Sequence, residues 1–228
     1  MAVYDRIVLS CEHAGHRVPA EYGHLFADRP EVLRTHRGYD IGIRPVAEVL
    51  AERLACPIVR FDLSRLLVEP NRSRGLFSEF SRVLPGSDRQ ALVERYHRPY
   101  RRSVLEMVEA PIRAGHTVLH LSMHSFTPEL DGRRRNADVG LLYDPARTAE
   151  KAVALNLQDR LASDLALRVR RNYPYRGTSD GMTAWLRRRF PPRAYLGLEI
   201  EINQALLQSG ARAFRNTLCQ ALCRVLGP

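Results

Sequence analysis

Short apolar runs alternate with longer amphipathic stretches along most of the chain. The apolar runs have the length of buried strands, and the longer stretches repeat their apolar positions at helical spacing. The predicted strands are residues 6–10, 57–61, 117–123, 138–143, 167–172 and 195–202. The predicted helices are residues 41–54, 88–114, 146–165, 181–189 and 211–226. We expect the second helix to bend at Pro99, because proline lacks the amide hydrogen that a helix interior uses.

This alternation predicts an α/β fold. Strands of a parallel sheet are covered on both faces by helices, so they form near-continuous apolar runs like these. We therefore expect a three-layer α/β/α sandwich with a mostly parallel central sheet, in one domain spanning residues 1–228. Residues 63–87 show neither pattern, and ordered loops of this length are often functional.

Composition restricts the class of protein further. Hydrophobic residues make up 45% of the 228, enough for a core that needs no disulfides. The four cysteines include no CxxC pair, which favours buried thiols in a reducing, cytoplasmic compartment. We expect no secretory signal at the N-terminus. No apolar run approaches the roughly 18 residues of a membrane span, so we expect no membrane association.

The net charge of +10 raises the alternative of a basic, non-enzymatic nucleic-acid-binding protein. Lys151 is the only lysine, and the arginines are spread along the whole chain. Aromatic residues interleaved with basic ones, the pattern that suits base stacking, are not found. Attraction of a small anionic substrate is the interpretation we favour. The sequence gives no indication of the oligomeric state.

Polar side chains lie at the ends of several predicted strands, where ligands bind in open α/β sheets. They are His13, His124, Asp144 and Asn172, with Glu199 and Glu201 on the last strand. Two histidines and a carboxylate are the ligand set of a catalytic zinc site, which needs a further carboxylate as a base. Hydrogen-bonded structural histidines are the alternative.

The other histidines are weaker candidates. His120 lies inside a predicted strand and is expected to be a hydrogen-bonded core residue. His16 and His36 could approach the site. Three further histidines are expected on loop or helix surfaces, without a role: His24, His97 and His116.

Several segments resemble, in order, the motifs of one enzyme family. They are SCEHAG at 10–15, YDIG at 39–42, NR at 71–72, MHSFTP at 123–128, DVGLLYD at 138–144, NYPY at 172–175 and LEIEI at 198–202. In order and spacing they resemble the N-formylglutamate amidohydrolase family, across residues 7 to 207.

The resemblance implies a fold like that of zinc-dependent exopeptidases and aspartoacylases, with a mixed sheet of eight strands or a similar number. It also implies one Zn²⁺ per chain, held by His13, His124 and a third ligand. Those peptidases place a glutamate three residues after the first histidine, whereas this chain has His16 there. Asp40 is the third ligand we expect, with Glu12 or His16 as alternatives.

The resemblance further implies an amide hydrolase acting on a small anionic N-acyl amino acid, with N-formyl-L-glutamate as the expected substrate and histidine degradation as its setting. Glu201 is the expected base, although Glu199 faces the same side of its strand. Arg72, assisted by Asn71, is the expected partner of the substrate carboxylate, because a guanidinium binds a carboxylate through two parallel hydrogen bonds. Further candidates for substrate binding are Arg135, Asn172 and Tyr175. A different N-acyl amino acid or a peptide amide is the alternative substrate.

Overall fold

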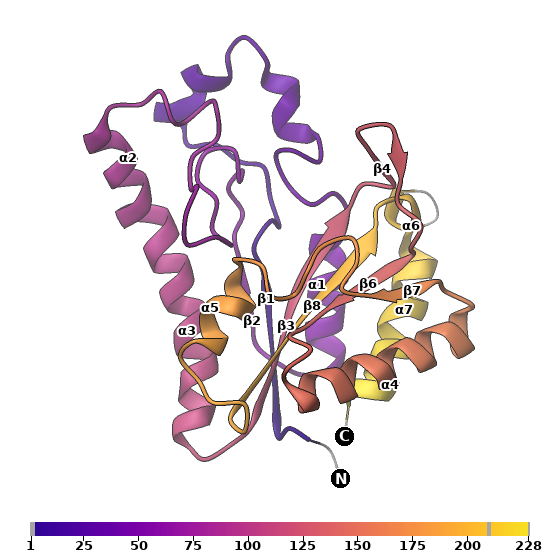
Figure 1. The fold of residues 1–228 in the computed structure, drawn as a ribbon. Coiled ribbons are helices and arrows are strands. Elements are labelled where there is room, and N and C mark those ends of the chain that lie inside the picture. The colour runs from indigo at the N-terminus through magenta and orange to yellow at the C-terminus, as the bar shows by residue number, and fades with distance from the viewer. Residues whose placement is uncertain (1–2, 209–210, 228) are drawn as a thin grey trace.

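The computed structural model describes residues 3–208 and 211–227. A six-stranded sheet with the order β2-β1-β3-β8-β6-β7 forms its centre (Figure 1). The strands of this sheet are β1 (Arg6–Cys11), β2 (Ile58–Arg60), β3 (Val118–Phe126), β6 (Val139–Leu142), β7 (Val169–Arg171) and β8 (Tyr195–Asn203). A separate hairpin pairs β4 (Glu129–Leu130) with β5 (Arg133–Arg134).

The central sheet is mixed. Strands β2, β1, β3 and β8 are parallel to one another, β6 is antiparallel to β8, and β7 is parallel to β6. The expected α/β sandwich with a mostly parallel sheet is therefore confirmed, with six central strands in the described residues rather than eight. Because β6 and β7 are reversed, their carboxyl ends do not join those of β1 and β3. The expectation that Asp144 and Asn172 end their strands at the same edge of the sheet as His124 was wrong for this reason.

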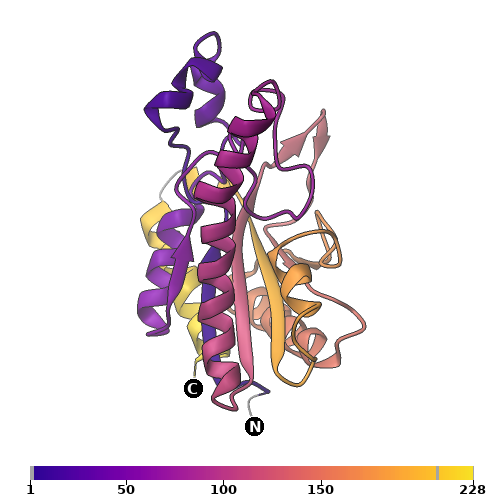
Figure 2. The same cartoon turned by 90° about the vertical axis from the view of Figure 1, so that its left-hand side faces the viewer.

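Helices cover both faces of the sheet. The helical segments are η1 (Ala20–Phe26), η2 (Pro30–Arg34), α1 (Ile43–Arg53), α2 (Gly86–Leu92), η3 (Val93–His97), α3 (Arg98–Arg113), α4 (Thr148–Leu165), α5 (Met182–Arg187), α6 (Ala205–Gln208) and α7 (Ala211–Leu226). One apolar core joins the sheet to α1, α4 and α7, and a second joins it to α3 and α5. Figure 2 shows α1 and α7 on one side of the strands and α5 on the other. Within the described residues, none of the helices has both the length and the apolar character needed to cross a bilayer.

Alternation along the two central strands separates core residues from site residues. On β3, Leu121 and Met123 pack into the core with α1, α4 and α7. Successive side chains point to opposite faces, so Ser122 and His124 point to the other face of the sheet. Strand β8 repeats the pattern, and its Glu201 pairs with His124 across the ladder. The polar residues of both strands therefore share one face near the carboxyl ends of β3 and β8.

The long helical stretch is continuous from α2 through α3, as predicted, but its irregularity precedes the proline. Segment η3 is a turn of π-helix, and Pro99 lies in the first turn of α3. Proline has no amide hydrogen, so one helical hydrogen bond is missing here, and the wider turn accommodates its loss.

Residues 20–34 and 63–85 form a cap beyond the carboxyl ends of β1 and β3 (Figure 1, top). The cap has a small apolar core of its own, in which the Phe26 and Phe80 rings stack at 4.9 Å beside Leu67 and Leu92. The long segment without a regular pattern is thus ordered by this third, local core.

Candidate metal centre and active site

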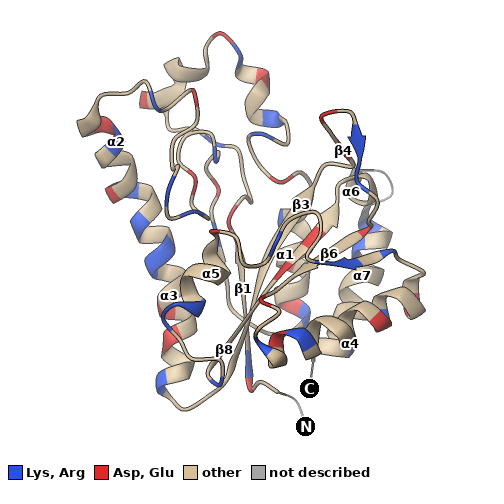
Figure 3. Ribbon diagram, in the orientation of Figure 1, with Lys and Arg blue, Asp and Glu red and all other residues tan. Residues whose placement is uncertain are grey.

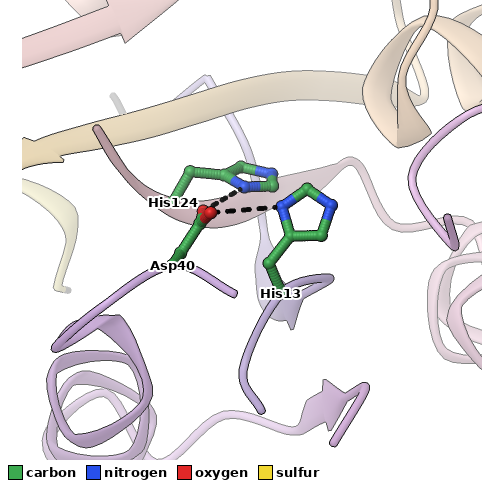
Figure 4. Close-up of side chains that lie close together, drawn as sticks. All are labelled: His13, Asp40 and His124. Carbon is green, nitrogen blue, oxygen red and sulfur yellow. Dashed lines mark hydrogen bonds and ion pairs between the residues drawn. The ribbon is translucent and has the colours of Figure 1, made fainter. Parts of the chain in front are cut away.

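Three buried side chains from different elements converge at the carboxyl edge of the sheet. His13 follows β1, Asp40 precedes α1 and His124 lies on β3 (Figure 4). One ligand atom from each lies within 4.8 Å of those of the other two. The backbone supports the arrangement, because the Asp40 amide donates to the His13 carbonyl at 3.0 Å and the Ser125 amide donates to Asp40 Oδ2 at 3.1 Å. Residues far apart in sequence therefore form a possible metal site.

Both histidines direct Nδ1 at the Asp40 carboxylate. His124 Nδ1 lies 2.9 Å from Oδ2, and His13 Nδ1 lies 3.5 Å from Oδ1 (Figure 4). The outer nitrogens contact oxygen atoms instead. His13 Nε2 lies 2.7 Å from Glu69 Oε1, and His124 Nε2 lies 2.9 Å from Ser122 Oγ and 3.2 Å from Glu12 Oε2. A carboxylate can only accept, and Ser122 Oγ already donates to Glu12, so each Nε2 carries a proton. A cation that takes the place of the protons between Asp40 and the two Nδ1 atoms would have all three groups as ligands.

The electrostatics fit a cation between these atoms. Burial alone would lower the pKa of His124, but its hydrogen bonds to Asp40 and Glu12 raise that pKa well above its usual value. Burial alone would raise the pKa of Asp40, but the two histidines lower it. His13 Nδ1 is buried, and no atom in the described part of the chain forms a hydrogen bond with it. Two imidazoles and one carboxylate, each imidazole oriented by a second carboxylate, match the donor set and surroundings of a zinc site.

The two alternative third ligands lie elsewhere. Glu12 is behind His124, where it accepts hydrogen bonds from Ser122 Oγ at 2.7 Å and from Tyr100 OH at 3.2 Å. His16 lies against the ring of Tyr39, with centroids 4.7 Å apart. Of the three candidates, Asp40 is the one that the structure brings to both Nδ1 atoms.

Glu199 and Glu201 differ in their partners. Glu199 accepts a hydrogen bond from Thr183 Oγ1, whereas Glu201 Oε2 is buried and has no hydrogen-bond partner among residues 3–208 and 211–227. Burial, together with the nearby charges of Asp40 and Glu199, raises the pKa of Glu201 to about 7. Gly140, opposite Glu201 on β6, has no room for a side chain, because a Cβ there would lie 2.0 Å from the Tyr173 carbonyl oxygen. Glu201 is thus the available carboxyl group beside the histidines.

The site opens into a pocket of about 220 Å³. His13, Asp40, His124, Glu199 and Glu201 line it, as do Asn71, Arg72, Arg135 and Tyr175. Asn172 is not among the lining residues. Its Oδ1 accepts the backbone amides of Tyr143 and Gly177, so it supports the segments that follow β6 and β7.

The Asn71–Arg72 segment is held by its backbone, which leaves the Arg72 side chain exposed to the pocket. Arg101 Nη1 donates to the Asn71 and Arg72 carbonyls at 3.0 Å each, and Asn71 Oδ1 accepts the Met182 amide at 2.6 Å. Across the pocket, the Arg135 guanidinium lies 5.1 Å from the Tyr175 ring centroid. Arg72 and Arg135 are thus two of the four arginines that line the pocket.

Sequence reasoning placed some of the polar residues well and missed others. His120 contacts Ser10 Oγ at 2.6 Å and Tyr195 OH at 2.8 Å, which confirms the expected core role. His97, expected on the surface, is buried and contacts the Arg72 carbonyl at 3.0 Å, so that expectation was wrong. Glu69 was missed because it lies in the cap, away from any strand end. The spacing of four residues between Arg65 and Glu69 was the one signal that could have indicated their ion pair.

The sequence matches the family model described as N-formylglutamate amidohydrolase over residues 5–208. The chain belongs to the N-formylglutamate amidohydrolase family. Membership identifies it as an amide-hydrolysing enzyme. No curated protein is significantly similar to it in sequence.

Two solved structures extend this comparison. Gene product Atu2144 from Agrobacterium tumefaciens is 28% identical with a TM-score of 0.76, over 98% of this chain and 93% of that one. The N-formylglutamate amidohydrolase from Ralstonia eutropha JMP134 is 21% identical with a TM-score of 0.68, over 96% and 92%. The fold is therefore that of the family.

Basic residues are not collected on one element. Figure 3 shows them on α3, on the β4–β5 hairpin and on β7, which lie in different parts of the molecule. Pocket-lining arginines come from several segments as well, namely Arg65, Arg72, Arg135 and Arg176. The excess positive charge thus reaches the pocket of this family member as well as its periphery.

Proposed function

We propose that this protein is a zinc-dependent amidohydrolase that cleaves the amide of an anionic N-acyl amino acid, with N-formyl-L-glutamate as the first substrate to test. The observation that supports it is the pairing of His13, Asp40 and His124 with the unpartnered carboxyl of Glu201 in one pocket. Products would be formate and L-glutamate.

Each protein group has a defined task in this proposal. His13 Nδ1, His124 Nδ1 and Asp40 would hold Zn²⁺, which acts as a Lewis acid toward water and the amide carbonyl when it is bound. Glu201 takes a proton from the attacking water and delivers it to the leaving nitrogen. In the metal-free site, burial raises the pKa of Glu201 to about 7, which suits a group that both takes up and releases a proton near neutral pH.

Substrate binding is assigned to the arginines of the pocket. Arg72 binds one substrate carboxylate through paired hydrogen bonds, and its fixed backbone defines where that carboxylate lies. Arg135, beside Tyr175, binds the second carboxylate. A substrate with two carboxylates fits such a pair of cations better than an N-acyl amino acid with a single carboxylate does.

The test is formate release from N-formyl-L-glutamate before chelation, after chelation and after zinc is added back. Loss and recovery of formate release would support the metal requirement and the substrate together. One bound zinc per chain without formate release would contradict the substrate and direct the search to other N-acyl amino acids. If the protein binds no zinc and hydrolyses no substrate after zinc is supplied, the proposal as a whole is contradicted.

A further inference from the structure

Glu69 joins the two halves of the site, although no strand-end pattern pointed to it. Its Oε1 accepts from His13 Nε2 at 2.7 Å and from the Asn71 backbone amide at 3.0 Å. Its Oε2 accepts from Arg65 Nε at 2.8 Å and from Arg65 Nη2 at 2.6 Å. Both oxygens of one buried carboxylate are therefore occupied by four donors from three residues.

We propose that Glu69 is a positioning residue, which fixes the ring of His13 for metal binding and holds the Asn71–Arg72 segment at the pocket through the same oxygen atom. The part that concerns substrate rests on the proposed function, whereas the part that concerns His13 and the Asn71 amide does not. Neither contact involves the reacting atoms, so Glu69 acts through its neighbours.

The first contact determines which nitrogen of His13 is free. A carboxylate accepts only, so Nε2 must donate. In the neutral ring, the form that binds a metal ion, Nδ1 then keeps its lone pair toward Asp40. Carboxylates that orient metal-binding histidines in this way typically affect metal affinity by about 10- to 100-fold when they are replaced.

The second contact distinguishes Glu69 from Glu12. Both carboxylates lie at the outer nitrogen of a candidate metal ligand, His13 for Glu69 and His124 for Glu12. Glu12 contacts Ser122 and Tyr100, which do not reach the substrate segment. Only Glu69 also contacts Asn71, so Glu12→Gln is a matched control for the loss of a buried carboxylate.

Arg65 gives the Glu69→Gln substitution a specific consequence. Arginine cannot give up its proton, so the glutamine oxygen will turn toward Arg65 and its NH₂ group toward His13. His13 Nε2 must then accept, which moves the ring proton to Nδ1, between the ring and Asp40. E69Q should therefore weaken zinc binding by about 10- to 100-fold, within the range for such residues.

The experiment measures zinc affinity by competition with a chromophoric chelator, and hydrogen exchange at the Asn71 amide. E69Q and E12Q should both bind zinc more weakly, but only E69Q should speed exchange at Asn71, by about tenfold for one lost hydrogen bond. Adding Arg65→Met should improve zinc affinity more in E69Q than in the wild type, because the glutamine oxygen is then free to face His13.

Wild-type zinc affinity in a folded E69Q protein, or unchanged exchange at Asn71, would overturn the proposal. An equal effect of Arg65→Met in both backgrounds would also overturn it. If E69Q does not fold, the imidazole nitrogen spectrum of the zinc-loaded wild type decides: Nε2 protonated on His13 supports the proposal, and Nε2 bound to zinc overturns it. These readouts need no substrate, so a failure to hydrolyse N-formyl-L-glutamate would count against the proposed function alone.

Discussion

Glu201→Gln should remove most of the hydrolysis while it stabilises the metal-free protein. Glutamine has nearly the same shape but cannot take a proton from water, and a positioned general base typically contributes about 10²- to 10⁴-fold to the rate. The same substitution removes an ionisable group that is buried, has an oxygen without a partner and lies near Asp40 and Glu199. Activity and stability should therefore change in opposite directions.

The size of the stability gain follows from the pKa of Glu201, which is raised from 4.5 to about 7. The unfolded chain releases this proton near pH 4.5, whereas the folded protein keeps it until about pH 7. The free energy of unfolding of the wild type therefore falls by about 3 kcal/mol in total as the pH rises through this window, and then levels off. E201Q does not share this loss, so its advantage is small near pH 5 and greatest above pH 7.

Thermal unfolding of both proteins after chelation, from pH 5 to pH 8, tests this reasoning. At about 2–4 °C per kcal/mol for a chain of this size, E201Q should melt about 6–12 °C higher than the wild type at pH 8. Glu129→Gln, on the exposed β4–β5 hairpin, is the matched control and should leave the melting temperature unchanged. An E201Q protein that is no more stable than the wild type at pH 8 would refute the argument.

Two further substitutions test the pocket and the core. Arg72→Ala should raise the KM for N-formyl-L-glutamate by about 10- to 100-fold, which is the value of a charge-assisted hydrogen bond. Arg74→Ala, outside the pocket lining, should leave the KM unchanged. An unchanged KM for R72A in steady-state kinetics would exclude Arg72 as the carboxylate partner. Leu121→Ala, at a fully buried position of β3, should lower the free energy of unfolding by about 2–5 kcal/mol in urea titrations. Val83→Ala, which is 72% exposed, should change it little, and equal effects of the two would contradict the assigned core.

Local patterns were sufficient to predict most of the fold. The six central strands and the long helices follow from runs and periods that each segment contains within itself. Strand direction does not, because the reversal of β6 against β8 depends on how the chain returns to the sheet. That is why Asp144 was expected at the carboxyl edge, whereas its backbone amide binds Glu150 elsewhere.

The site was predictable to the extent that its residues lie beside regular elements. Strand ends indicated His13, His124 and the pair Glu199 and Glu201. The family resemblance added Asp40 and favoured Glu201, and the structure brings these residues to one pocket. Glu69 could not be found in this way. Its contact with His13 crosses from the cap to the end of β1, and no spacing along the chain encodes such a contact.

The separate core of the cap divides the enzyme into parts that can change at different rates. The groups proposed for proton transfer and metal binding are held largely by the sheet, whereas Arg65 and Arg72 belong to a segment packed around Phe26 and Phe80. Phe26 and Phe80 belong to this core and to neither of the two cores that join the sheet to its helices, and distant sites contribute to stability almost independently. Descendants of this chain could therefore acquire a preference for other amide substrates through changes around Phe26 and Phe80, as long as Glu69, which joins the cap to His13, is kept.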